Sequence, residues 1–127
     1  MIKTVSSLIL AAATFTVAIP AASALTSAQV KQCNTMGQSL QVRQAEAQKK
    51  AKAREALLEQ VEAAGDTWED AEATRLFSAG HAATADAAKV KYDTLKADLM
   101  RREMALQSLV GQINEDVAAY NGLCAKD

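Results

Sequence analysis

The only histidine of the chain, His81, is the last residue of the segment Ser78-Ala79-Gly80-His81. A histidine so close to a serine could act as a general base or could activate the serine as a nucleophile. Both need a third group that orients the histidine and a pocket that excludes water. The nearest carboxylate in sequence is Asp86, and no glycine-flanked strand–turn–helix setting surrounds Ser78. We therefore expect His81 to be an exposed turn residue, and we expect no catalytic residue.

Cys33 and Cys124 are the only cysteines, and they are far apart in the sequence. Two distant cysteines and one histidine do not have the spacing of zinc ligands, so we expect no bound metal and no other cofactor. In an oxidising compartment, two cysteines most simply form one disulfide. Two free thiols or a bridge to a second chain are the alternatives.

Residues 1–24 have the pattern of a secretory signal peptide, with an early lysine, an apolar run over residues 8–19 and the ending Ala22-Ser23-Ala24. The apolar run is shorter than the roughly 20 residues that span a membrane, so we expect cleavage before Leu25 rather than a retained anchor. Residues 25–127 then form a single exported domain without a membrane span. The alanine-rich signal is typical of bacteria, and we predict the periplasm, with secretion as the alternative.

The charges of the chain nearly balance, with 14 basic and 15 acidic side chains. The basic run at residues 49–54 is followed at once by acidic residues and contains no aromatic side chains that stack on bases. Such a surface predicts no general affinity for nucleic acid or anionic lipid. Hydrophobic residues make up 50% of the sequence but aromatic residues only 4%, which suits a thin seam between helices better than a thick core.

Strong helix formers dominate the chain after its single proline, which predicts an all-α fold. Thr26 and Gln29 have the spacing of a capping box and predict the start of a first helix. Thr84 is the predicted cap of a second helix. Apolar and small residues recur at three- and four-residue steps in both halves, as one helix face requires. The first stripe is Val30, Cys33, Gly37, Leu40, Ala47, Ala51, Leu58, Val61 and Trp68, and the second is Tyr92, Leu95, Leu99, Leu106, Val110, Ile113, Val117, Tyr120 and Cys124.

A bridge between Cys33 and Cys124 would fix the register of two antiparallel helices, because residues whose numbers have the same total as these two would face each other. The midpoint falls near Gly80, so bridge and glycine indicate the same turn, which we place near residues 78–83. The register sets glycines opposite aromatic rings, Gly37 opposite Tyr120 and Gly65 opposite Tyr92. It also sets side chains of unlike charge near each other: Arg43 near Glu115 and Asp116, Arg54 near Glu103, Glu55 near Arg101 and Arg102, Glu62 near Lys96, and Glu69 and Asp70 near Lys89. The sequence therefore predicts a long, coiled-coil-like antiparallel two-helix hairpin with its ends joined by a disulfide.

Gly65 is the point at which this fold has an alternative. A glycine followed by Asp66 can end a helix, and a short third helix from Thr67 to Phe77 would then fold back. A glycine inside a continuous helix costs only about 1 kcal/mol relative to alanine. The pairing of the two arms favours one long helix that is bent or loosened at Gly65.

Leu76 and Phe77 lie just before the predicted turn, where they either close the seam or form an exposed anchor for a partner. With His81 they make up the predicted partner-binding tip. Because the sequence contains no catalytic or cofactor motif, we expect a non-enzymatic protein of the bacterial envelope that acts as a protein–protein interaction or structural module. A holdase-like module that binds unfolded clients as a homo-oligomer is the alternative.

Overall fold

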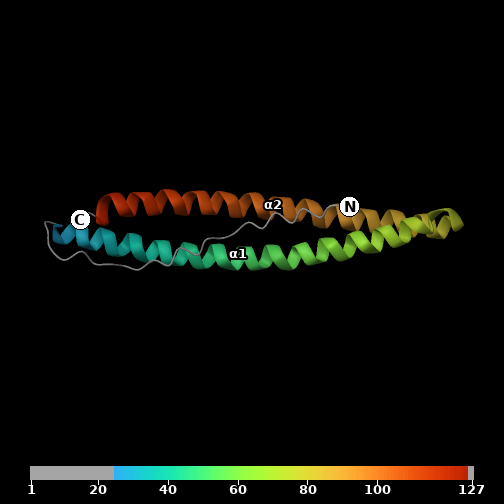
Figure 1. Ribbon diagram of the computed structural model, residues 1–127, viewed down its shortest axis with the longest axis horizontal. Coiled ribbons are helices and arrows are strands. Elements are labelled where there is room, and N and C mark those ends of the chain that lie inside the picture. Colours follow the sequence, from blue (N-terminus) through green and yellow to red (C-terminus); the bar gives the residue numbers. More distant parts are fainter. Residues whose placement is uncertain (1–24, 126–127) are drawn as a thin grey trace.

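The computed structural model describes residues 25–125, which form two long antiparallel helices lying side by side (Figure 1). Helix α1, Ser27–Ala73, has 47 residues, and helix α2, Ala79–Cys124, has 46. The short 3₁₀ helix η1, Arg75–Phe77, connects them at one end of the rod. At about 1.5 Å per residue, each long helix measures about 70 Å. The predicted all-α hairpin is confirmed, and the predicted signal peptide lies outside the described residues.

Helix α1 begins where the sequence predicts and continues further than the alternative allows. The Thr26 hydroxyl oxygen accepts a hydrogen bond from the Gln29 amide at 3.2 Å, and the Gln29 side-chain oxygen accepts one from the Thr26 amide at 2.8 Å. This reciprocal capping box is confirmed. The helix then passes through Gly65 without a break, so the proposed third helix from Thr67 to Phe77 is wrong. The absence of a side chain at Gly65 makes room for the ring of Tyr92.

The connection lies earlier in the chain than predicted. Helix α1 ends at Ala73, and α2 begins directly after Ser78. The expected turn at residues 78–83 and the expected cap at Thr84 are therefore wrong. Ser78 has extended backbone angles, and its hydroxyl oxygen accepts a hydrogen bond from the His81 amide at 3.2 Å, as an N-cap does. Thr84 instead donates its hydroxyl to the Gly80 carbonyl at 3.0 Å, inside the helix. Serine and threonine are both good caps, and the sequence contained both.

The core is a single thin seam along the length of the rod. Its buried residues are Cys33, Leu40, Ala47, Leu57, Val61, Ala64, Ala85, Ile113 and Cys124. The predicted stripes contain most of these, but they miss Leu57, Ala64 and Ala85 and wrongly include Val30, which is 45% exposed. Only Ala85 is completely inaccessible, so no large side chain among the described residues is fully buried. The hairpin therefore has little apolar burial to hold it together.

Within residues 25–125, no helix has the length and apolar character needed to cross a membrane.

Candidate interaction site at the hairpin tip

The register of the two helices is fixed at one end by a covalent bond. Cys33 and Cys124 form the predicted disulfide, with their Cα atoms 5.7 Å apart. A Cβ atom built on Gly37 would lie 3.8 Å from Tyr120, and one built on Gly65 would lie 3.3 Å from Tyr92. Both predicted glycine–tyrosine pairs are confirmed. The pairing that the cysteines define therefore continues well over halfway along the rod towards the turn.

Two of the predicted interhelical ion pairs also form, and both fill polar interruptions in the seam. Arg43 donates to Asp116, and Arg54 donates to Glu103 at 3.1 Å. The Arg54 and Glu103 side chains are 27% and 33% exposed, so this pair is partly shielded from water. A polar pair at this level lets the helices stay in register without an apolar contact.

The other predicted pairs between the helices do not form, because partners on the same helix are nearer. Arg101 and Arg102 both donate to Asp98, three and four residues away on α2, and not to Glu55. Lys89 pairs with Asp93 and lies 5.4 Å from the ring centroid of Trp68. Lys96 lies 5.6 Å from the ring centroid of Tyr92 instead of pairing with Glu62. No ion pair of Glu69 or Asp70 occurs within residues 25–125.

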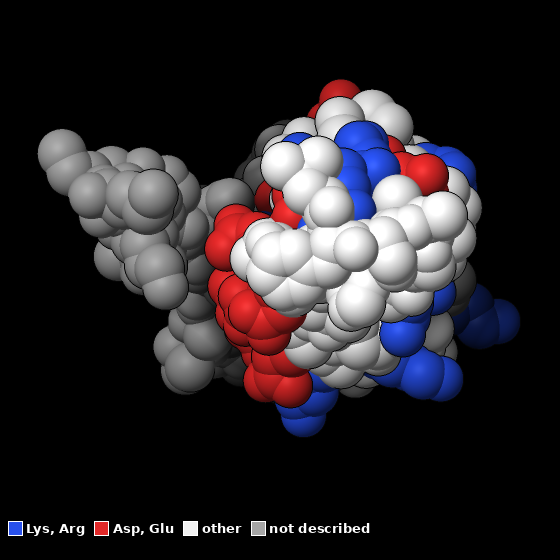
Figure 2. Space-filling model, turned by 90° about the vertical axis from the view of Figure 1, so that its right-hand side faces the viewer, with Lys and Arg blue, Asp and Glu red and all other residues white. Residues whose placement is uncertain are grey.

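The end of the rod opposite the disulfide presents two large apolar side chains to solvent. Leu76 is 94% exposed and Phe77 is 74% exposed, so of the two predicted alternatives the one in which they close the seam is wrong. The tight 3₁₀ turn of η1 directs them outwards. Figure 2 views this end of the rod and shows an uncharged centre with acidic side chains on one flank. We call Leu76, Phe77 and His81 the tip patch.

Arg75 closes the end of the seam in place of the apolar pair. It donates to Glu72 at 2.8 Å, one turn back on α1, and to Asp86 at 2.7 Å on α2. The hydrogen bond from Arg75 is the main cause of a lowered pKa at Glu72, and the bonds to Glu72 and then Asp86 raise the pKa of Arg75. One side chain thus ties both helices together directly beneath the tip patch. Sequence reasoning missed this role of Arg75 and Asp86, because it depends on where the turn lies.

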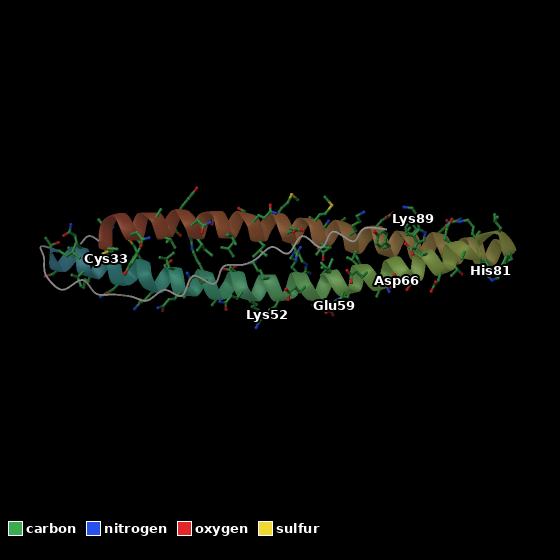
Figure 3. All side chains as sticks on the ribbon, in the orientation of Figure 1. Cys33, Lys52, Glu59, Asp66, His81 and Lys89 are labelled. Atoms are coloured by element: carbon green, nitrogen blue, oxygen red, sulfur yellow. A yellow bond between two sulfur atoms is a disulfide. The ribbon has the colours of Figure 1, made fainter. Side chains whose placement is uncertain are left out.

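Ser78 and His81 lie together as their spacing suggests, but in a capping arrangement. Ser78 Oγ is 2.7 Å from His81 Nδ1 and also caps the backbone of α2. The His81 ring lies edge-on to Phe77, with the ring centroids 5.8 Å apart. Both Ser78 and His81 are exposed (His81 is labelled in Figure 3), so the pair lacks the shielded setting that acid–base catalysis requires. Its contacts orient the Phe77 ring.

Trp68 forms a small aromatic cluster below Arg75. Its ring stacks on Tyr92 with centroids 5.5 Å apart, and Lys89 lies over it. The buried Nε1 of Trp68 makes no hydrogen bond of normal geometry within residues 25–125, although its N–H helps to lower the pKa of Glu72. The aromatic cluster and the Arg75 ion pairs join α1 to α2 directly below the exposed turn and hold the turn in place.

Within the described residues, no three His, Cys, Asp or Glu side chains come together in a group that could hold a metal ion. Comparisons of the chain with known protein families, with characterised proteins and with solved structures find no match.

Proposed function

We propose that this is an exported, non-enzymatic envelope protein whose hairpin binds a protein partner through the tip patch. The observation that carries the proposal is the exposure of Leu76 and Phe77 at 94% and 74%. Burying a large apolar side chain gains about 1.5–3 kcal/mol, so a partner that covers both would gain appreciable affinity. Leu76 is also the most exposed of the large hydrophobic residues in the described chain.

The tip patch is held in place before any partner arrives. Arg75 joins both helices beneath it, Ser78 caps α2 beside it, and His81 packs edge-on against Phe77. Such order reduces the conformational entropy that binding must remove. A rod about 70 Å long with an ordered apolar end is suited to contact a partner that lies far from the disulfide end.

The disulfide supports the proposed location outside the cytoplasm, because such bonds persist in oxidising compartments. We place the protein in the bacterial periplasm, with release from the cell as the alternative. A holdase that covers unfolded clients would be expected to use a continuous apolar flank. The exposed apolar residues on the helix flanks are instead divided between α1 (Val30, Val42) and α2 (Val90, Met100, Met104), so they favour this alternative less.

The test uses photo-crosslinking in intact cells that export the protein. A photoreactive amino acid at Ala79, beside the tip patch, leaves Leu76 and Phe77 unchanged. The same amino acid at Ala45, an exposed position on α1 far from the turn, is the matched control. We expect one protein adduct from position 79 that is absent from position 45. The adduct is identified by mass spectrometry, and the captured protein is then purified for direct binding measurements.

The decisive variant is Phe77→Ala, with Val42→Ala as its control because Val42 is 69% exposed on the side of the rod. We expect Phe77→Ala to weaken binding of the captured protein about tenfold or more, and Val42→Ala to leave it unchanged. Circular dichroism verifies that helicity is retained. Undiminished binding by Phe77→Ala would overturn the proposal. So would tip-dependent binding to neutral lipid vesicles without any protein adduct, since the tip would then contact a membrane.

A further inference from the structure

The negative charge of the hairpin is concentrated at the end that carries the tip patch. Residues 66–86 extend about 11 Å along each helix from the connection and contain five acidic side chains and one basic side chain, a net charge of −4 with His81 neutral. Residues 25–125 contain 14 acidic and 12 basic side chains, a net charge of −2. The rest of the described chain therefore has a net charge of +2.

Three of the five acidic side chains have no basic partner in the hairpin. Asp66, Glu69 and Asp70 are exposed on α1, and they form no ion pair within residues 25–125. The single basic side chain of this region, Arg75, is held by the other two acids. Asp66 lies three and four residues before the other two unpaired acids, so the three are neighbours on the helix surface and repel one another. We call these three residues the acidic flank.

We infer that the protein bound by the tip patch has an apolar pocket for Leu76 and Phe77 that is bordered by lysine or arginine side chains. This inference rests on the proposed function and adds the chemistry of the partner. Figure 2 shows acidic side chains gathered on one flank of the uncharged tip, so the basic border lies on one side of the pocket. Basic groups there would attract the tip and relieve the repulsion within the acidic flank.

The same charges disfavour the other occupants of an exposed apolar tip. A leucine–phenylalanine pair also suits insertion into a lipid surface, but a net charge of −4 is repelled by anionic headgroups. A second copy bound tip to tip would bring two negative ends together, which is unfavourable for the same reason. Electrostatic complementarity therefore favours a different protein with a positive surface around its pocket.

The test uses the protein that is captured by photo-crosslinking at position 79 and then purified. Its association with the hairpin is measured by stopped-flow fluorescence at ionic strengths of about 0.01 M and 0.15 M, where the Debye length is about 30 Å and about 8 Å. We expect the association rate constant to fall about tenfold or more over this range, with little change in the dissociation rate constant, because exposed charges act mainly on the encounter. Mass spectrometry of the crosslinked peptide should place lysine or arginine residues beside the contact.

The decisive variant is Glu69→Gln/Asp70→Asn, which removes two charges of the acidic flank. At low ionic strength it should lower the association rate constant about threefold or more. The control is Glu46→Gln/Glu115→Gln, the same change of net charge at exposed positions more than about 40 Å from the connection, and it should associate at the wild-type rate. Circular dichroism verifies that both variants remain helical.

The outcomes separate this inference from the proposed function. If Phe77→Ala weakens binding while Glu69→Gln/Asp70→Asn associates at the wild-type rate, the basic border is wrong and the proposed function stands. A contact without nearby basic residues, or an adduct with a second copy of the chain, would also overturn the inference alone. If no protein is captured, or if Phe77→Ala binds normally, both are overturned. Tip-dependent binding to phosphatidylglycerol vesicles without a protein adduct would likewise overturn both.

Discussion

Replacing Gly65 with alanine tests how tightly the two helices pack in the half of the rod nearer the tip. An added Cβ atom would lie 3.3 Å from Tyr92 Cε2 and 3.6 Å from Tyr92 Cδ2. The first of these distances is shorter than ordinary van der Waals contact. Tyr92 is stacked on Trp68 with ring centroids 5.5 Å apart, so its ring cannot retreat without disturbing the indole.

The expected change in stability is the difference of two effects. Exchanging glycine for alanine inside a helix gains about 1 kcal/mol, while forcing an extra methyl group into a packed contact costs about 1–3 kcal/mol. We expect Gly65→Ala to leave the free energy of unfolding unchanged or to lower it by up to about 2 kcal/mol. Gly111 has nothing within 4 Å of an added Cβ, and Gly37 has Tyr120 at 3.8 Å. Alanine at either of these positions should gain about 1 kcal/mol.

Urea unfolding of the oxidised protein, followed by circular dichroism, measures all three variants under the same conditions. The urea dependence should be the same in each, so that midpoints can be compared directly. Gly111→Ala gives the gain from helix propensity alone, and the shortfall of Gly65→Ala relative to it measures the contact with Tyr92. If Gly65→Ala stabilises the protein as much as Gly111→Ala does, the reasoning about a tight seam at Tyr92 is wrong.

Two further predictions concern the ends of the rod. Reduction of the disulfide removes a cross-link between residues 91 positions apart and should lower the free energy of unfolding by about 4–5 kcal/mol. The midpoint of urea unfolding should therefore fall steeply in reductant. An unchanged midpoint would mean that the cross-link does not stabilise the fold by restricting the unfolded chain. The hydrogen bond from Arg75 lowers the pKa of Glu72 below its usual 4.5, so the stability that this carboxylate adds is present above pH 4.5 and is lost as the pH falls through the lowered value. Acid should therefore lower the protection of the Phe77 amide, measured as its hydrogen-exchange rate relative to that of an unprotected amide at the same pH. This amide donates to the Thr74 carbonyl at 3.0 Å. Glu72→Gln should remove this pH step, while the exposed Glu62→Gln should retain it, and equal responses in both variants would count against the ion pair between Arg75 and Glu72.

The overall hairpin could be predicted from the sequence because the cysteine pair and the glycine–tyrosine pairs indicate the same register, and because local residues mark where α1 begins. The cysteines fix which residues face each other, and Gly37 and Gly65 then fall opposite Tyr120 and Tyr92. The capping box at Thr26 depends only on residues three apart and was also predictable. Periodicity alone was less exact: Leu57 and Leu58 both fit the stripe, and packing decided that Leu57 is the more deeply buried.

The tip was harder to predict because several residues there have competing roles. Ser78 and Thr84 can each cap a helix, and the choice of Ser78 moves the turn towards the N-terminus and places His81 inside α2. That choice also determines whether Leu76 and Phe77 are buried or exposed. The partners of Lys89 and Arg102 were missed for another reason, since carboxylates on the same helix compete with those across the seam.

Binding at the tip patch should not depend directly on the disulfide, because the two lie at opposite ends of the rod. The disulfide lies at the open end of the rod, whereas Arg75 and the Trp68–Tyr92 stack hold the turn at the other end. Between them the seam is thin, so the redox state of the cysteines reaches the tip only through the global unfolding equilibrium. Reduced protein that is still folded should therefore bind a tip partner with unchanged affinity, and affinity should be lost in parallel with helicity as the reduced hairpin unfolds.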